Sequence, residues 1–218
     1  MSESGFQLRT LTFIDSMQPQ LAQFLARDKE NIITAPKNYE AALIIEIAPA
    51  MEIHTMTDMA LKNTKVRLGT LVTERQFGLM QVHHADQGEV AEAGRAILRE
   101  TGLNEHQRAK VDIVTNKIIR GVEQDHAIMF TGTARGNMVL AGESVLILET
   151  SPAAYIATAC NEALKASRAK LIDCRPYGAT GRLIMSGPEA EIDVASAAAT
   201  KILNILNEML VKKTSTQL

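Results

Sequence analysis

The sequence repeats itself at a spacing of 103 residues, and no other feature constrains the fold as much. Residues between Ile44 and Gly78 return between Ile147 and Gly181 without a gap. The matching pairs are Ile44-Ile45-Glu46 with Ile147-Leu148-Glu149, Pro49-Ala50 with Pro152-Ala153, Ala60-Leu61-Lys62 with Ala163-Leu164-Lys165, and Arg67-Leu68 with Lys170-Leu171. Solenoid repeats run about 20–50 residues, so this unit has the size of a small domain. The 218 residues therefore predict two fused copies of one domain, over 1–106 and 107–218.

Composition is ordinary for a soluble globular protein, with 46% hydrophobic and 22% charged residues. A net charge of −2 gives no broad attraction to nucleic acid or to a membrane. We find no apolar run of about 18 residues and no signal-peptide pattern at the N-terminus. The two cysteines, Cys160 and Cys174, lack metal-ligand spacing. We therefore expect a cytoplasmic protein without a nucleic-acid or membrane partner.

Hydrophobic periodicity predicts four strands and two main helices in the first copy. A stripe of Ile53, Met56, Ala60 and Leu61 indicates the buried side of the first helix, and Gly102 ends the second. We also expect a helical turn near Leu21. The predicted strands are Leu8–Ile14, Ala41–Ile47, Val66–Thr73 and Leu79–His83, and the helices start at Pro49 and run over Gly88–Arg99.

The second copy follows the same order, with a loop over Thr131–Asn137 and a disordered tail after Leu210. Its predicted strands are Val111–Ile119, Ser144–Leu148, Ala169–Cys174 and Gly181–Met185, and its helices start at Pro152 and run over Glu189–Leu210. This order predicts an α+β fold of two tandem ferredoxin-like domains, each an antiparallel sheet with helices packed on one face.

These motifs together resemble the shell-protein domain of bacterial microcompartments, over about residues 7–207. The ordinary domain has a strand after its last helix, whereas here a strand precedes each copy, which is similar to the circularly permuted, tandem-domain class. Five motifs resemble the gated shell trimers of carboxysomes and their relatives: Leu8-Arg9-Thr10, Phe13-Ile14-Asp15, Gln18-Pro19-Gln20, Thr73-Glu74-Arg75-Gln76-Phe77-Gly78 and Ile118-Ile119-Arg120.

The resemblance implies a homotrimer in which six domains form a flat pseudohexameric tile of a microcompartment shell. Such tiles join other shell proteins at their edges, and in carboxysome members two trimers can stack around a cavity. A gated pore on the threefold axis is implied to pass small charged metabolites.

Two connections between strands are candidates for the pore, and we name them the tips. The first tip is Glu74, Arg75, Gln76, Phe77 and Gly78, and the resemblance matches Glu74 and Arg75 to gate residues. Three like charges around an axis repel unless each finds an opposite partner, so a Glu–Arg pair can close the opening or swing away. The second tip is Tyr177, Gly178, Ala179, Thr180 and Gly181, which is small and uncharged.

Lys62 and Lys165 end the first helix of each copy, where a cation also complements the helix dipole. The resemblance places this lysine at the tile edge, and Arg120 is a further edge candidate.

Other residues do not support metal or catalytic chemistry. His83 and His84 are neighbours on a strand and point to opposite faces, and Cys174 is expected to be buried. We find no pairing of a nucleophile with a base, and we expect no cofactor. Two alternatives stay open: a small-molecule sensor built from two ferredoxin-like regulatory domains, and, less favoured, an enzyme.

Overall fold

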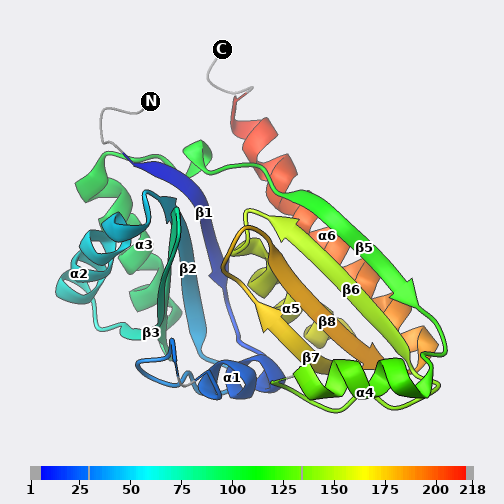
Figure 1. Ribbon diagram of the computed structural model, residues 1–218. Helices are drawn as coiled ribbons and strands as arrows, with labels where there is room; N and C mark the ends of the chain where they lie inside the picture. Colours follow the sequence, from blue (N-terminus) through cyan, green and yellow to red (C-terminus); the bar gives the residue numbers. More distant parts are fainter. Residues whose placement is uncertain (1–5, 29, 134, 215–218) are drawn as a thin grey trace. The chain divides into compact units, whose positions relative to one another are not determined.

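The computed structural model describes residues 6–28, 30–133 and 135–214, and the chain divides into two compact units. Unit 1 is built mainly from the chain up to Lys110, and unit 2 spans Val111–Met209. Each unit holds one four-stranded antiparallel sheet with helices packed on it (Figure 1). The expected α+β class, with two copies of one antiparallel domain, is confirmed.

Unit 1 has the sheet order β1-β2-β4-β3. Because β1 comes first in the chain and pairs with β2, the order is the permuted one expected from the sequence. The α3 helix ends at Gly102 in the left-handed conformation, as predicted (φ 67°). The elements are β1 (Gln7–Ile14), α1 (Pro19–Ala26), β2 (Ala41–Ala48), η1 (Ala50–Glu52), α2 (Ile53–Asn63), β3 (Arg67–Glu74), β4 (Phe77–His84), α3 (Gln87–Thr101) and η2 (Glu105–Gln107).

Unit 2 repeats this order as β5-β6-β8-β7. Its elements, with α6 continuing to the end of the described chain, are β5 (Asp112–Ile119), α4 (Gln124–Thr133), β6 (Ser144–Ser151), α5 (Tyr155–Ala166), β7 (Lys170–Arg175), β8 (Gly181–Gly187) and α6 (Glu189–Thr214).

Several expected boundaries are wrong. The loop expected from Thr131 begins later, because α4 continues to Thr133 and tolerates Gly132 in its last turn. Neither Pro49 nor Pro152 is a helical residue: Pro49 is extended (ψ 155°) before η1, and α5 starts at Tyr155. The tail expected after Leu210 is helical to Thr214, and residues 215–218 lie outside the described part of the chain.

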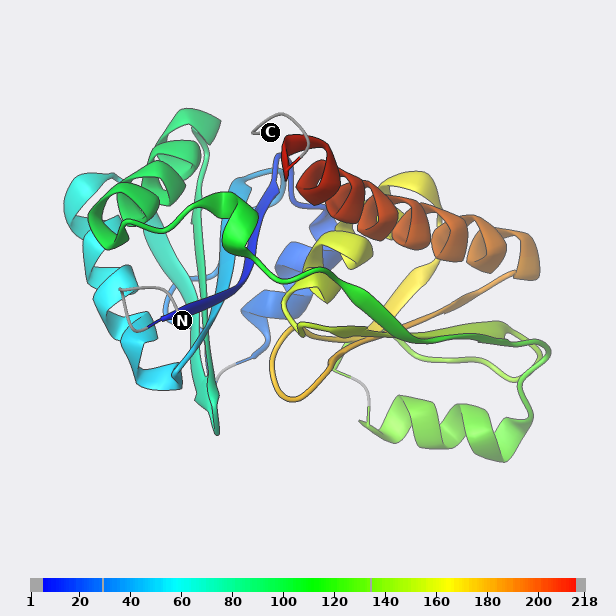
Figure 2. The ribbon, with the colours of Figure 1, turned by 90° about the horizontal axis from the view of Figure 1, so that it is seen from above.

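The core of unit 1 lies between its sheet and the helices α2 and α3, which cover one face (Figure 2). Alternate residues of β2 face these helices, and Ile53, Met56 and Ala60 of α2 are buried against them as expected. Leu61 was expected in this stripe but is 40% exposed, because it lies beyond the buried arc of the helix.

Unit 2 has helices on both faces of its sheet, which corrects the expectation of helices on one face only. Figure 2 shows α5 and α6 on one side of this sheet and α4 on the other. Ala127 of α4 packs with Val145 and Ile172 of the sheet. Successive strand residues point to opposite faces, so Leu146 and Leu148 are buried on the α5 side.

The outer edges of β3 and β7 are covered by segments of the same chain. In unit 1 the Ile33 amide donates to the Gly69 carbonyl (2.7 Å). In unit 2 the repeat-related Gly136 donates to the Ile172 carbonyl (2.9 Å). A Cβ on Gly136 would lie 2.3 Å from the Leu171 oxygen, so only glycine allows this approach.

None of the helices in residues 6–28, 30–133 and 135–214 has both the length and the apolar character needed to cross a bilayer.

Candidate functional site

The first tip is a tight hairpin that joins β3 to β4. Glu74 pairs with Phe77, so only Arg75 and Gln76 lie between the strands, and both are exposed. The sequence placed the strand ends one or two residues short of this turn. The structure therefore presents the Glu74-Arg75 pair at the end of a two-stranded hairpin.

Arg75 has a backbone conformation that non-glycine residues rarely adopt, with φ at 55°. The residue at the same place of the second copy is Gly178, which also has a positive φ of 105°. The fold thus requires the same unusual backbone at both tips, and the first copy carries an arginine where the second carries glycine. One other position shows this relation, Tyr39 (φ 66°) against Gly142 (φ 84°).

Behind the first tip lies a hollow of about 960 Å³ within unit 1. Arg75 and Gln76 line one side of it, and the backbone around η1 lines another. Space next to the turn allows these two side chains to change direction without displacing the core. The lining residues are Phe6, Gln7, Leu8, Ala48, Pro49, Ala50, Met51, Arg75, Gln76, Leu103 and Gln107.

Phe77, the first residue of β4, is held from behind by a charged side chain. The guanidinium carbon of Arg9 lies 3.7 Å from the centre of the Phe77 ring. Arg9 Nε in turn donates to Oε1 of Glu46 at 2.6 Å, and Glu46 is 1% exposed. No sequence pattern indicates this arrangement, because Arg9, Glu46 and Phe77 lie far apart in the chain.

The second tip is longer and contains no acidic side chain. It connects β7 to β8 through residues 176–180, and the Arg175 guanidinium lies 5.7 Å from the Tyr177 ring. Thr180 Oγ1 lies 3.5 Å from Oε1 of Glu149. Ala179 is the exposed residue of this tip.

The glycine that closes each tip has an intradomain role. A Cβ on Gly78 would lie 2.2 Å from the Ala50 oxygen, and a Cβ on Gly181 would lie 2.0 Å from the Ala153 oxygen. Both glycines therefore allow a strand to pass directly under the start of a helix.

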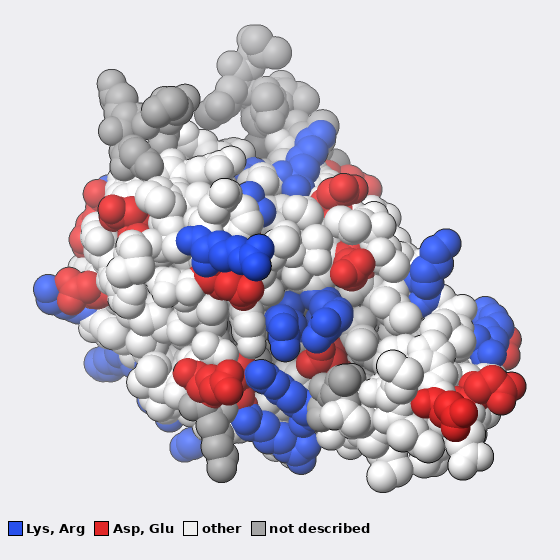
Figure 3. Space-filling view, viewed as in Figure 1, with Lys and Arg blue, Asp and Glu red and all other residues white. Residues whose placement is uncertain are grey.

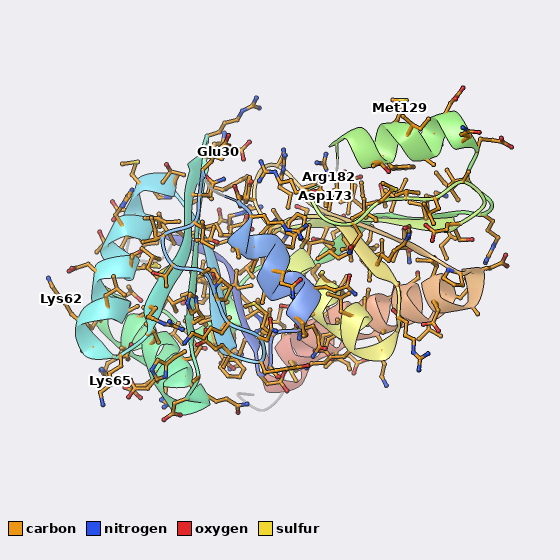
Figure 4. The ribbon with its side chains drawn as sticks, turned by 90° about the horizontal axis from the view of Figure 1, so that it is seen from below. Glu30, Lys62, Lys65, Met129, Asp173 and Arg182 are labelled. Carbon is orange, nitrogen blue, oxygen red and sulfur yellow. The ribbon has the colours of Figure 1, made fainter. Side chains whose placement is uncertain are left out.

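The three edge candidates all have ion-pair partners in their own unit. Lys62, exposed at the end of α2 (Figure 4), pairs with Asp58 at 2.6 Å, and this hydrogen bond raises the pKa of the lysine. Lys165 pairs with Glu162 at 2.8 Å. Arg120 pairs with Glu189 (2.6 Å) and with Asp193 (2.9 Å) on α6.

Two ion pairs, each with a buried carboxylate, were not predicted from the sequence. In unit 1, Glu40 pairs with Arg67 and lies 3.8 Å from the fully buried His83. In unit 2, the Arg182 guanidinium donates to Asp173 at 2.7 Å, and the two are adjacent in Figure 4. Neither contact can be read from the sequence, because Glu40, just before β2, meets Arg67 of β3, and Asp173 and Arg182 lie on different strands.

Cys174 is buried, which confirms the expectation. The structure also brings the buried Cys160 of α5 next to it, a contact that the sequence does not indicate. The hydrogen bond between the two thiols, with Cys174 as the donor, and burial raise the pKa of the Cys174 thiol. The described residues contain no group of three or more His, Cys, Asp or Glu side chains that could hold a metal ion. Figure 3 shows basic and acidic side chains interspersed over one face.

Comparison with known proteins gives consistent matches. A family model described as "CsoS1D N-terminal domain" matches residues 8–107. The carboxysome shell protein CsoS1D of Hydrogenovibrio crunogenus is 44% identical, over 92% of this chain and 97% of the relative. The carboxysome shell protein CcmP of Synechococcus elongatus is 41% identical, over 93% of this chain and 94% of the relative.

Two solved structures have the same fold throughout. One is described as the fused permuted hexameric shell protein from the RMM microcompartment, with a TM-score of 0.89, 39% identity, and coverage of 92% of this chain and 98% of that one. The other is described as a double-ringed trimeric shell protein from the same microcompartment, with a TM-score of 0.88, 33% identity, and coverage of 92% and 97%.

Proposed function

The chain belongs to the family of circularly permuted, tandem-domain shell proteins of bacterial microcompartments, and from this premise we propose that it forms a gated trimeric tile. Its role is structural, in the shell. We propose further that three chains form a pseudohexamer assembled in the cytoplasm, that units 1 and 2 correspond to the two shell domains, and that small charged metabolites pass through a central pore. No catalytic role is part of this proposal.

The conformation of Arg75 carries the gate proposal. A positive φ at a non-glycine residue costs roughly 1–3 kcal/mol and tends to occur at functional sites. The second copy avoids that cost with Gly178, so the first copy retains a charged side chain at a place where the backbone favours glycine. A requirement for the guanidinium at the tip accounts for this difference.

Three first tips around a threefold axis would place three Glu74–Arg75 pairs in one opening. Exposed ion pairs contribute only about 0–1 kcal/mol, so open and closed arrangements of these side chains would differ little in free energy. The hollow beside Arg75 and Gln76 supports this view, because it provides space for the open arrangement. A bound metabolite could then shift the balance between the two.

A pair of glycine substitutions tests the gate. Arg75→Gly and Tyr39→Gly both relieve a positive φ, but only the first removes a tip charge. A spin label on Gln76→Cys reports tip-to-tip distances in the trimer, and the native cysteines are buried. We expect short distances in the parent protein, spread between the closed and open arrangements, a changed distribution with Arg75→Gly, and no change with Tyr39→Gly. Long distances in the parent would place the tips away from the axis and refute the gate.

Native mass measurement tests the assembly. We expect three or six times the 23.8 kDa mass of one chain. A stable monomer at micromolar concentration would contradict the tile.

For the six-chain form, we propose that α4 contributes to stacking of two trimers. Ile128 and Met129 of α4 are 60% and 70% exposed, and Met138 and Leu140 of the adjoining segment are also exposed. Met129 points away from the sheet in Figure 4. The double-ringed trimeric relative with the same fold supports a second trimer as the occupant of this surface. Met129→Lys is expected to convert six-chain particles to three-chain particles, and an unchanged mass would refute the role of α4.

At the tile edges we propose Lys62, Lys165 and Arg120 as contacts to neighbouring shell proteins. Their partners within the chain, such as Asp58 for Lys62, would hold each side chain extended towards the neighbour.

A further inference from the structure

The carboxylate of Glu46 is connected to the first tip through two side chains. It accepts a 2.6 Å hydrogen bond from Arg9, and the Arg9 guanidinium lies on the ring of Phe77. Phe77 follows the exposed turn directly. Charge-assisted hydrogen bonds are among the stronger ones in proteins, and a cation over an aromatic ring adds attraction. The base of the tip is therefore held by a buried carboxylate on another strand.

The backbone of β1 is shaped for this contact. Leu8 pairs with Ile47 and Thr10 pairs with Glu46, so Arg9 is an extra residue in the strand. Such β-bulges change the direction of a side chain.

The second copy has the β-bulge but lacks the arginine that connects the glutamate to the tip. Ile113 pairs with Thr150 and Thr115 pairs with Glu149, which leaves Val114 as the extra residue. Val114 is 50% exposed and carries no charge. The arginine link is thus present only behind the tip that carries Glu74 and Arg75.

The repeat also identifies a second partner for Glu46. In the second copy the Thr115 hydroxyl donates to Glu149 at 2.8 Å. The equivalent Thr10 is fully buried opposite Glu46, yet its hydroxyl has no hydrogen-bond partner within the described residues. A buried hydroxyl without a partner is unfavourable. Glu46 therefore has two possible hydrogen-bond donors. It accepts from Arg9 in this structure, and the counterpart of Thr10, Thr115, donates to Glu149 in the second copy.

We propose that Glu46 is a positioning residue of the first tip that works by exchanging these two donors. When Glu46 accepts from Arg9, the guanidinium holds Phe77 and the tip is fixed. When Glu46 accepts from Thr10, Arg9 is released and the tip is free to move. This inference rests on the proposed function for its link to gating, but the exchange of donors itself is a property of unit 1.

Amide hydrogen exchange in the full-length protein tests the proposal, followed in the peptide that covers residues 72–80. Arg9→Val gives the first copy the residue of the second, and we expect exchange at the tip to become about tenfold faster, given the strength of a charged hydrogen bond and a cation–π contact. Thr10→Val removes the alternative donor without a change of shape, and we expect about threefold slower exchange at the same peptide. Thr115→Val, the matched control, should leave this peptide unchanged.

Faster exchange with Arg9→Val and slower exchange with Thr10→Val distinguish a positioning role of Glu46 from ordinary structural support. Unchanged exchange with Arg9→Val, unchanged or faster exchange with Thr10→Val, or a uniform rise across unit 1 would each overturn the inference. If exchange responds as expected but spin labels on Gln76→Cys lie far apart in the trimer, the donor exchange stands and the gate fails. If the labels lie close together and exchange does not respond, the gate stands and the role of Glu46 fails.

Discussion

His83 makes the stability of unit 1 dependent on pH in a way that can be calculated. The ring is fully buried. Burial lowers its pKa from 6.5 to about 4, and nearby Arg67 and His84 act in the same direction, whereas Glu40 opposes them. Gln81 Nε2 lies 3.3 Å from Nδ1, which suits a neutral ring that carries its proton on Nε2.

The sign and size of the effect follow from proton binding. Above pH 6.5 the ring is neutral in the folded and unfolded chain, so it adds no pH dependence. As the pH falls from 6.5 towards 4, the unfolded chain takes up a proton that the folded chain excludes, and the free energy of unfolding falls. Below pH 4 both forms are charged and the loss is complete. At 1.36 kcal/mol per pKa unit, the total loss is about 3 kcal/mol.

Urea unfolding between pH 7.5 and 4 measures this loss. His83→Gln keeps a polar side chain that does not titrate, so its stability should fall by about 3 kcal/mol less than that of the parent over this range. Carboxylates such as Glu143, whose pKa is also lowered, titrate alike in both proteins and cancel in the difference. Parallel curves for His83→Gln and the parent would refute the reasoning.

Three further substitutions test other parts of the structure. Gly78→Ala places a Cβ against helix backbone and should lower stability by about 1–3 kcal/mol in thermal or urea unfolding. Gly94→Ala, where the nearest side-chain atoms are 3.6 Å away, should raise stability by about 0.5–1 kcal/mol. A more stable Gly78→Ala than Gly94→Ala would contradict the packing described. Asp86→Ala removes the N-cap of α3, whose carboxylate accepts from an amide at 2.7 Å, and should lower stability by about 1 kcal/mol in the same assay; no loss would mean that the cap is dispensable. Lys62→Ala should reduce extended sheets seen by electron microscopy without a change in the mass of the trimer, whereas Lys65→Ala, beyond the helix end, should leave the sheets intact; equal effects would exclude a specific edge contact.

The repeat and the periodicity predicted most of the fold because both depend on local patterns. Matched segments around Ile44 and Ile147 gave the duplication, and the strand before each copy gave the permuted order. The hairpin at Glu74 followed from two apolar runs with a polar turn between them. Each of these features is visible within a short window of sequence.

The features missed depend on contacts between distant residues. Nothing in the sequence indicates a bulge at Arg9, because a bulge reflects the pairing of two strands and not the pattern of one. The positive φ of Arg75 became informative only when Gly178 was found in the same conformation. Helix α4 was not predicted, and its last residues were predicted as part of a loop that contains Gly132. The roles of the tips and the edge residues stay predictions.

The covered edges of β3 and β7 decide how copies of this chain can adhere to one another. Open edges allow sheets to grow by adding strands from another molecule, and the segments at Ile33 and Gly136 occupy two such edges with backbone of the same chain. Contact between molecules along those edges is then left to side chains, which separate and rejoin without unzipping a ladder of main-chain hydrogen bonds. Each unit therefore keeps its own sheet intact when side-chain contacts at these edges form or break.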